Sequence, residues 1–531
     1  MTDWYAARLI TPEKLEIARL VLEEIRTGLD AFRAIRHHPL ADGGYVGKDV
    51  LVAAYRKLVE SGEWVADEHL MARIRMKPVR SLSGVTTVTV LTKPYPCPGD
   101  CIFCPTDARM PKSYLVDEPG AARAFQNDFD PYLQVKSRLD SYLAVGHPTD
   151  KIELLILGGT WSAYPHIYHA WFIQRCLDAL NGQDSTSLAQ AQEWNESTTH
   201  RNVGLVIETR PDRINPAELA WLRQLGVTKV QLGVQSLDDD ILQRNRRGHN
   251  AAQSLRATEL LRAAGFKIVL HWMPNLLGAT PTSDRVDFAR LWQGLCPDEL
   301  KIYPTQLLET AQLFQCWQQG DYHPYETDEL IDLIADLKPS IPHYCRVNRI
   351  IRDIPSQHVV AGNKRTSLRQ DVIAEMDRRG THCRCIRCRE VRGQEFAASD
   401  LRLVDEPYPA GLAEEHFLSF VTPDDHIVGY LRLSLPGQDS ADVLGEAFEA
   451  DLRGAALIRE VHVYGQALAV GAEQAGAAQH SGLGRRLLEA AAEIARSRGY
   501  RQLAVIAAIG TRAYYARRGF SRGVLYDIQP L

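Results

Sequence analysis

The spacing of hydrophobic positions changes along the chain. Residues 12–36 repeat apolar positions at the spacing of one helix face, which predicts a helix, and a second helix is predicted over 48–61. From residue 84 onward, short aliphatic and β-branched runs alternate with helical stretches. The runs are GVTTVTVL (84–91), KIELLIL (151–157), VGLVIET (203–209), KVQLGV (229–234), FKIVLHW (266–272) and ELKIY (299–303).

This alternation predicts six β–α units, with helices near 131–145, 165–181, 216–225, 250–265 and 284–294. Such an order requires a mostly parallel sheet covered by helices, so the fold class is α/β and the expected architecture is a partial (βα)6 TIM-like barrel. In barrels of this kind, chemistry gathers where the strands end. The polar stretch 183–200 is predicted to be a loop or an exposed insertion.

After about residue 395 the alternation stops. Two strand-like runs, HFLSFVT and HIVGYLRLSL, are joined by the turn PDD. IREVHVYG, a helix at 482–498, QLAVIAA, a short helix and a last strand follow, which indicates a separate mixed α/β domain. We therefore expect four parts: a helical extension (1–80), the barrel (81–340), a junction (341–394) and the second domain (395–531).

Charge is distributed unevenly on a chain of 531 residues whose net charge is −5. Residues 69–99 contain no acidic residue, and residues 338–392 contain 13 Lys and Arg against 5 Asp and Glu. Such patches are either solvated faces or sites for phosphates. If the second interpretation holds, the candidate RNA-binding residues are Arg73, Arg75, Lys77, Arg80, Lys364 and Arg365.

No stretch is long and apolar enough for a membrane span, and the start MTDWYAARLI lacks the layout of a signal peptide. A cytoplasmic protein with no membrane partner is therefore expected. Because that compartment is reducing, the ten cysteines are interpreted as ligands or free thiols.

Cys97, Cys101 and Cys104 form the spacing C-x3-C-x2-C directly after the first predicted strand. Three thiolates on one short loop can hold three irons of a 4Fe–4S cube and leave the fourth iron open. A zinc knuckle is the alternative, but it usually needs four paired ligands, and no fourth Cys or His is close by.

Polar or glycine residues follow the other predicted strands where a barrel active site should be. Gly158 and Gly159 end the second strand, and glycines allow close approach of the backbone to a ligand. The later strands end in Glu208, Gln235 with Ser236, His271, and Lys301 with Tyr303.

Cys383, Cys385 and Cys388 form a second cluster, C-x-C-x2-C, in the junction. Their tight spacing suits structural zinc, which would join the two domains. The fourth ligand is left open among His382, His343, Cys345 and His358. Free thiols and a second iron–sulfur cluster are the alternatives.

A glycine-containing turn, Gln479 to Arg485 with Gly482, Leu483 and Gly484, precedes the apolar helix of the second domain. Free backbone N–H groups at a helix N-terminus suit a pyrophosphate.

These motifs resemble two known families. C-x3-C-x2-C with Phe103 before the third cysteine resembles the radical-SAM superfamily, which implies S-adenosylmethionine on the open iron. The residues expected around it are Phe103, Gly158, Gly159, Glu208 and Gln235. Thr160 stands where that family often has Glu. The glycine turn resembles the GNAT acetyltransferases, which implies acetyl-CoA. By that resemblance, the pantetheine arm lies along Glu460, Val461, His462 and Val463. The pyrophosphate is held by Gln479, Gly482, Leu483, Gly484 and Arg485. The thioester is met by Tyr514 or, as the better match, Tyr515.

The two modules in this order resemble the Elongator catalytic subunits from about residue 70 to 531. Supporting stretches are LGGTWSAYP, IETRPD, VNRIIRDIP and GTRAYYARRGF. The resemblance implies carboxymethylation of C5 of the wobble uridine in a tRNA anticodon stem-loop, with Lys151 contacting acetyl-CoA. The compact cysteine spacing is typical of prokaryotic relatives, so no large scaffold complex is expected.

Other functions remain open from the residues. The chain could be a protein lysine N-acetyltransferase with the barrel as a recognition module and Glu460 or His462 as general base. It could also be an RNA-binding scaffold without turnover, or a methyl-transferring barrel regulated by acetyl-CoA. The products of the reaction distinguish these functions.

Overall fold

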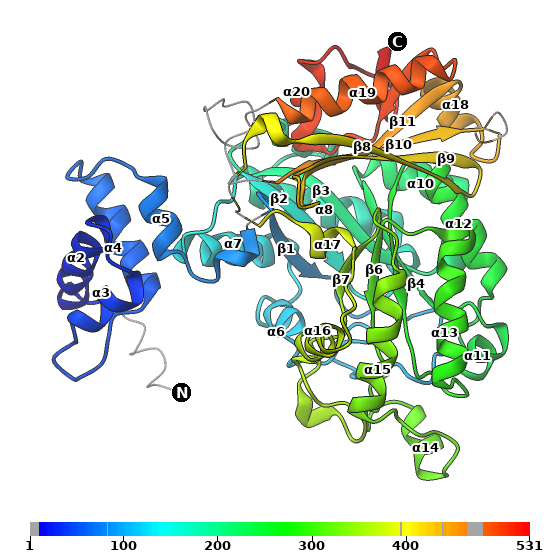
Figure 1. Cartoon of the computed structure of the whole chain (residues 1–531), viewed down its shortest axis with the longest axis horizontal. Coiled ribbons are helices and arrows are strands. Elements are labelled where there is room, and N and C mark those ends of the chain that lie inside the picture. The colour runs from blue at the N-terminus through cyan, green and yellow to red at the C-terminus, as the bar shows by residue number, and fades with distance from the viewer. Residues whose placement is uncertain are drawn as a thin grey trace.

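The computed structural model describes residues 10–81, 83–392, 394, 396–437, 440, 442–464 and 482–531, except for the side chains of residues 79 and 80. The chain forms a small helical unit, a barrel-like domain and a second domain that lies across one end of the barrel (Figure 1). No helix among these residues is long and apolar enough to cross a membrane.

The N-terminal helical unit has its own hydrophobic core and stands beside the rest of the molecule (Figure 1). Its helices are α2 (Pro12–Arg26), α3 (Ala31–His37), α4 (Lys48–Glu60) and α5 (Glu68–Ile74). The prediction of one helix over 12–36 is wrong. Gly28 adopts φ +110°, and Asp30 caps α3 by accepting hydrogen bonds from the N–H groups of Phe32 and Arg33.

The barrel-like domain is a parallel sheet whose strands pair in sequence order. They are β1 (Thr86–Leu91), β2 (Lys151–Leu157), β3 (Arg201–Thr209), β4 (Lys229–Gln235), β5 (Lys267–Trp272), β6 (Glu299–Ile302) and β7 (Arg346–Arg349). The six predicted strands are present. The seventh was missed because RVNR contains one apolar residue, Val347, and shows no hydrophobic run.

Helices cover the outside of this sheet (Figure 1). The five predicted ones are α7 (Pro131–Ala144), α8 (His166–Asn181), α10 (Pro216–Gln224), α12 (Ala251–Ala263) and α13 (Pro281–Arg290). The others are α6 (Pro119–Gln126), α9 (Leu188–Asn195), α11 (Asp239–Arg244), α14 (Leu313–Gln318), α15 (Thr327–Leu337), α16 (Leu368–Arg378) and α17 (Ile386–Arg389).

The predicted loop 183–200 therefore contains a helix, α9. Ser187 caps its start, and Ala191 and Asn195 are fully buried. The Asn195 amide donates to Asn181 Oδ1 at 2.8 Å and to the His200 carbonyl at 3.2 Å. The polar residues that indicated a loop are used in these internal hydrogen bonds.

The second domain is a mixed sheet in the order β13-β14-β12-β11-β10-β9-β8. Its strands are β8 (Arg402–Ala410), β9 (Ala413–Val421), β10 (Ile427–Pro436), β11 (Ala455–Val463), β12 (Gln502–Val505), β13 (Ser521–Arg522) and β14 (Asp527–Pro530), and its helices are α18 (Glu446–Leu452), α19 (Leu483–Ser497) and α20 (Arg512–Ala516). β11 and β12 run parallel and pair over Ala455–Ile458, so this pairing ends before Glu460.

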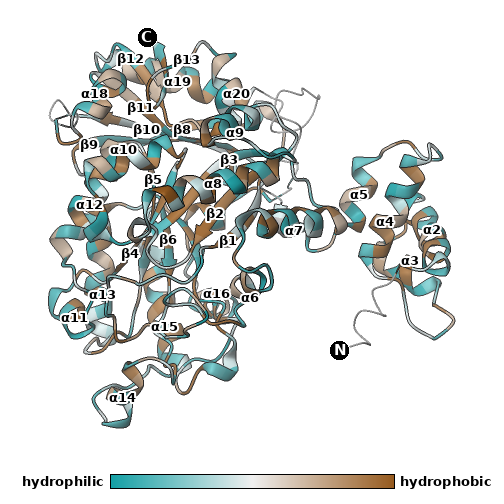
Figure 2. Ribbon diagram, turned by 180° about the vertical axis from the view of Figure 1, so that it is seen from behind, coloured by the Kyte–Doolittle hydropathy of each residue, from teal (hydrophilic) through white to brown (hydrophobic). Residues whose placement is uncertain are grey.

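One continuous hydrophobic core spans the barrel and the second domain, and both strands and helices contribute apolar residues to it (Figure 2). Buried charges also cross the boundary. Asp298, before β6, accepts from Arg459 of β11 and lies 3.4 Å from Arg432 of β10. Burial would raise the pKa of Asp298, but Arg459, Arg432 and Arg262 lower it below the usual range. The two domains therefore form one packed body.

Candidate active site

A cavity of about 1000 Å³ occupies the interior of the partial barrel and extends to the second domain. The wall is built by alternate residues of the parallel strands, such as Thr87 and Thr89 of β1 or Glu299 and Lys301 of β6. Cys97, Cys101 and Cys104 line one end, and β11 lines the other. Both predicted cofactor sites thus open into a single space.

The three cysteines of the loop after β1 have the features of cluster ligands. Cys101 is buried, and Arg247 NH1 lies 3.0 Å from its Sγ. The hydrogen bond from Cys104, together with the charge of Arg247, lowers the pKa of Cys101 to about 5, so this thiol is a thiolate at neutral pH. Thr160 Oγ1 lies 3.6 Å from Cys97 Sγ. A 4Fe–4S cube takes such thiolates, so the donor set fits that group.

Four of the residues predicted around S-adenosylmethionine line the same end: Phe103, Gly159, Glu208 and Gln235. Gly158 does not line the cavity. It adopts φ +142°, and a Cβ atom there would lie 1.8 Å from Thr92 Oγ1, so Gly158 allows close packing against the end of β1.

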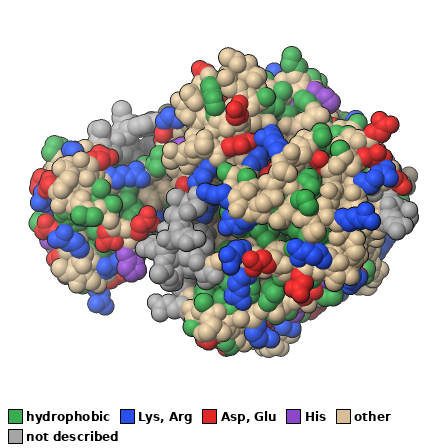
Figure 3. Space-filling model, turned by 90° about the horizontal axis from the view of Figure 1, so that it is seen from above, with side chains coloured by type: hydrophobic (Ala, Val, Ile, Leu, Met, Phe, Trp, Pro, Cys, Tyr) green, Lys and Arg blue, Asp and Glu red, His purple; other side chains and the backbone are tan. Residues whose placement is uncertain are grey.

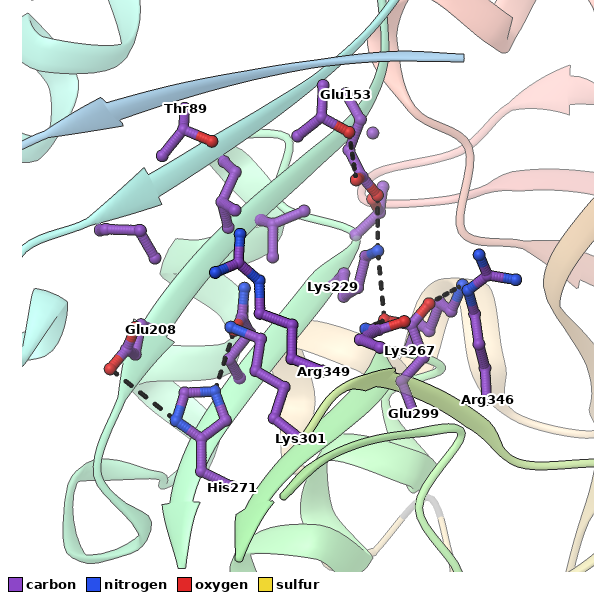
Figure 4. Close-up of a pocket in the computed structure, with 18 of the residues that line it drawn as sticks. Thr89, Glu153, Glu208, Lys229, Lys267, His271, Glu299, Lys301, Arg346 and Arg349 are labelled. Carbon is purple, nitrogen blue, oxygen red and sulfur yellow. Dashed lines mark hydrogen bonds and ion pairs between the residues drawn. The ribbon is translucent and has the colours of Figure 1, made fainter. Parts of the chain in front are cut away.

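The middle of the cavity is polar (Figure 4). Gln231 Oε1 accepts a hydrogen bond from Lys301 Nζ and lies 3.0 Å from His271 Nε2. Burial, followed by the charge of Lys301, holds the pKa of His271 well below its usual value, so this imidazole is neutral. Tyr114 donates to Glu208 at 3.3 Å.

Alternating charges line the wall toward the second domain (Figure 4). Lys229 lies 2.5 Å from Glu153 and 3.6 Å from Glu299. Lys267 lies 2.6 Å from Glu299 and 2.5 Å from Glu460. This ladder joins strands β2, β4, β5 and β6 of the barrel to β11.

Glu460 and His462 differ in their capacity to accept a proton. Both carboxylate oxygens of Glu460 are engaged, by Lys267 and the Tyr430 hydroxyl on Oε1 and by Arg432 on Oε2. Burial would raise the pKa of Glu460, but Lys267 and Arg432 lower it to about 2. Burial lowers the pKa of His462 to about 4, and its buried Nε2 has no hydrogen-bond partner among the described residues.

The rest of the predicted acetyl-CoA site surrounds the same end of the cavity. Gly482, Gly484 and Arg485 line it at the start of α19, and Leu483 is buried in the core. A Cβ atom on Gly484 would lie 2.6 Å from the Tyr514 hydroxyl. Tyr514 and the buried Tyr515 line the wall, as do Val461, Val463 and Lys151. Gln479 lies outside the described residues.

Comparisons with known proteins agree with this geometry. The radical SAM superfamily matches residues 95–291, the radical SAM C-terminal domain 297–378 and the acetyltransferase (GNAT) family 387–520. The tRNA uridine(34) acetyltransferase of Dehalococcoides mccartyi is 44% identical over 449 residues, which are 83% of this chain and 96% of the relative. The chain belongs to the tRNA uridine(34) acetyltransferase and Elongator complex protein 3 family. The predicted fold class and both family resemblances are confirmed.

Other members of the family show the same coverage. Elongator complex protein 3 of Homo sapiens is 34% identical over 85% of this chain and 85% of that protein. The solved structure of archaeal Methanocaldococcus infernus Elp3 with an N-terminal deletion is 35% identical, with a TM-score of 0.73 over 84% of this chain and 99% of that chain.

The second cysteine cluster also has a compact geometry. The Sγ atoms of Cys383, Cys385 and Cys388 lie within 4.8 Å of one another, which suits one metal ion. No fourth His, Cys, Asp or Glu joins them within that distance among the described residues. His343 contacts Glu406 at 3.1 Å, and His358 contacts Asp117 at 2.5 Å.

The basic residues predicted to bind RNA divide into two groups. Arg73 donates to the carbonyls of Ile25 and Leu29, both at 2.5 Å, and Arg75 donates to the Gly146 carbonyl at 2.7 Å. These two side chains hold the helical unit together and join it to the barrel.

The remaining basic candidates are solvent-facing where they are described. Lys77, Lys364 and Arg365 are exposed, and Arg365 lies 3.7 Å from Asp371. The side chain of Arg80 lies outside the described residues. Seen from above, Lys and Arg are interspersed with Asp and Glu (Figure 3).

Sequence reasoning missed the ladder formed by Glu153, Lys229, Lys267 and Glu299. The signal was present in the alternation K-I-E in β2, K-V-Q in β4 and E-L-K in β6. Strands of a parallel sheet are usually apolar on both faces, so a polar residue at every second position indicates a polar cavity inside the barrel. Arg210 and Arg247 were missed because their approach to Cys101 is a tertiary contact.

Proposed function

We propose that this chain carboxymethylates C5 of the wobble uridine of tRNA, using acetyl-CoA and S-adenosylmethionine. The observation that supports the proposal best is the single cavity between Cys97, Cys101 and Cys104 at one end and β11 with Tyr514 at the other. A radical generated at the cysteine end would meet an acetyl group delivered from the second domain without leaving the protein.

Cys97, Cys101 and Cys104 would hold a 4Fe–4S cluster, which with bound S-adenosylmethionine supplies a 5′-deoxyadenosyl radical. That radical would remove hydrogen from the acetyl methyl group, and the new carbon radical would add to C5 of uridine. Loss of the C5 proton, with return of one electron to the oxidised cluster, would balance the electron used to cleave S-adenosylmethionine. Hydrolysis of the thioester then gives 5-carboxymethyluridine and CoA.

The residues of the chain would bind and position these reactants. Glu460 to Val463 of β11, beyond the stretch that pairs with β12, would run beside the pantetheine arm, and the N–H groups at the start of α19 would donate to the pyrophosphate. Lys151 faces the same cavity, where burial lowers its pKa below the usual value. His462, neutral and with an unpartnered Nε2, takes the proton of the hydrolytic water.

Two further assignments belong to this proposal. Cys383, Cys385 and Cys388 bind a structural zinc ion at the junction. The exposed basic residues Lys77, Lys364 and Arg365 bind tRNA phosphates, and the wobble uridine is splayed out of its loop to enter the cavity.

The rival function, protein lysine acetylation, would use Glu460 or His462 as base. Three donors hold Glu460 as a carboxylate, and although burial would raise its pKa, Lys267 and Arg432 lower it to about 2, which makes it a weak base for a substrate amine. Only His462 remains for that role.

The test is anaerobic incubation of reconstituted enzyme with tRNA bearing uridine 34, S-adenosylmethionine, reductant and acetyl-CoA, followed by mass spectrometry of the nucleosides. We expect a carboxymethyl group on uridine that disappears with Cys101→Ala. Acetyl groups on protein lysines with unmodified uridine would support the rival function, and methylated uridine would support methyl transfer.

A further inference from the structure

We propose that Arg247 tunes the reduction potential of the cluster by donating a charged hydrogen bond to the thiolate of Cys101. The inference rests on the cluster site of the radical SAM domain and not on the carboxymethylation chemistry. The proposed function can therefore fail without affecting this inference, and this inference can fail without affecting the proposed function.

Arg247 is fixed in place by the surrounding backbone. Its side chain is buried, and NH2 donates to the Gly233 carbonyl in β4 while NH1 points to Cys101 Sγ at 3.0 Å. Its own carbonyl accepts from Arg210 NH2 at 2.7 Å. Burial and the hydrogen bond to the Gly233 carbonyl thus hold the guanidinium beside Cys101.

Among the described residues, the charge of Arg247 also lacks a carboxylate partner. No carboxylate oxygen lies within salt-bridge distance of it among the residues that the structure describes, whereas the neighbouring buried Arg210 is paired with Asp212 at 2.8 Å. Arg210 NH1 lies farther from Cys101 Sγ, at 4.0 Å. Burying an unpaired guanidinium is costly, so its field must be balanced by negative charge at the cysteines.

The electrostatic consequence has a definite sign. A 4Fe–4S cluster with three thiolates carries one negative charge when oxidised and two when reduced, because reduction adds one electron from a low-potential donor. A fixed cation 3.0 Å from one thiolate stabilises the doubly negative state more. Hydrogen bonds to cluster sulfurs and local charge are known determinants of cluster potential. Arg247 therefore makes reduction easier.

The test compares Arg247→Gln with Arg247→Lys and with Arg246→Gln. Arg246 is the adjacent residue, but its side chain is exposed and faces Asp100 at 3.4 Å, so it is a matched control. Each protein is reconstituted, its iron and sulfide are quantified, and the midpoint potential is measured by dithionite titration followed by electron paramagnetic resonance. Acetyl-CoA, tRNA and S-adenosylmethionine are all left out.

Arg247→Gln is expected to shift the reduction equilibrium toward the oxidised cluster by about tenfold or more, because a charged hydrogen bond is lost; tenfold is about 59 mV for one electron. Arg247→Lys should shift it less, and Arg246→Gln should leave it unchanged. An unchanged midpoint potential in Arg247→Gln, with iron and sulfide at the wild-type level, would overturn the proposal. Failure of both Arg247 variants to retain iron, with Arg246→Gln loaded, would overturn it as well.

Discussion

Lys267 Nζ, at the start of barrel strand β5, lies 2.5 Å from Oε1 of Glu460 on β11 of the second domain. The same ammonium group lies 2.6 Å from Glu299 of β6. One lysine thus neutralises a carboxylate from each domain at the point where the cavity passes between them. The domain contact and the wall of the candidate active site depend on the same charges.

Lys267→Met should destabilise the protein strongly. The substitution leaves Glu299 and Glu460 buried side by side with one fewer cation, and breaking a buried pair costs about 3–5 kcal/mol. Urea denaturation measures the free energy of unfolding. Arg349→Gln is the control, because its pair with Asp353 is about half-exposed on both sides and is worth about 0–1 kcal/mol. Equal losses in the two variants would contradict the expected role of Lys267.

The domain interface should weaken in acid. Burial raises the pKa of Glu460, but Lys267 and Arg432 bring it down to about 2, and Glu299 and Asp298 are also lowered. A carboxyl group with a depressed folded-state pKa contributes its full stability above its unfolded pKa of about 4.3. That contribution is lost as pH falls from about 5 toward 2.

Melting temperatures measured between pH 7 and pH 3 test this sign. The wild-type value should fall steeply below about pH 5, and Glu460→Gln should melt at a lower temperature at pH 7 but show a shallower fall. A parallel pH dependence in the two proteins would show that Glu460 does not titrate with folding.

His462→Asn should abolish most of the thioester hydrolysis. Burial lowers the pKa of this imidazole to about 4, so it is neutral and is the proposed general base, and general bases contribute about 10²–10⁴-fold. Release of free CoA thiol measures the rate. Because His462 is unprotonated above about pH 5, the wild-type rate should not fall between pH 8 and pH 5 through this group. S-adenosylmethionine cleavage without acetyl-CoA should be unaffected in the variant.

The sequence was most informative where the hydrophobic pattern was long and local. Strand β2 and helix α8 lie within one residue of their predicted bounds, because unbroken aliphatic runs and a helical period determine them. β7 and β8 were missed, since RVNR and the mostly exposed RLVDEPYPA owe their conformation to neighbouring strands. Two further features depend on single residues: Gly28 ends the first predicted helix early, and Ser187 caps the start of α9.

For the site, contiguous motifs predicted which residues line the cavity, and Glu208, Gly484 and Tyr515 all do so. Roles that depend on tertiary partners could not be predicted. From the sequence, Arg73 is predicted to be an exposed phosphate ligand. In the structure its guanidinium donates hydrogen bonds to backbone carbonyls 44 and 48 residues away. Glu460 looks like a general base until its three donors are known.

Gly484→Ala should weaken acetyl-CoA use through Tyr514. The new Cβ atom would lie 2.6 Å from the Tyr514 hydroxyl, which must move from the wall of the site. We expect KM for acetyl-CoA to rise about tenfold, equivalent to about 1.4 kcal/mol, with the fold intact by circular dichroism. Tyr514→Phe removes the clashing oxygen. In the Tyr514→Phe background, Gly484→Ala should therefore raise the KM for acetyl-CoA much less than it does in the wild-type protein. Additive effects of the two substitutions would contradict this steric coupling.

Salt dependence should separate phosphate-binding cations from structural ones. Lys77, Lys364 and Arg365 are exposed, so replacing all three with Ala should flatten the plot of log affinity for tRNA against log salt, by about 0.7–0.9 for each phosphate that is no longer neutralised. Arg73→Ala is the matched contrast. It removes the same charge but deprives the Ile25 and Leu29 carbonyls of their donor, so it should lower the melting temperature and leave the slope unchanged. A flattened slope in Arg73→Ala with unchanged stability would instead place that guanidinium on the RNA.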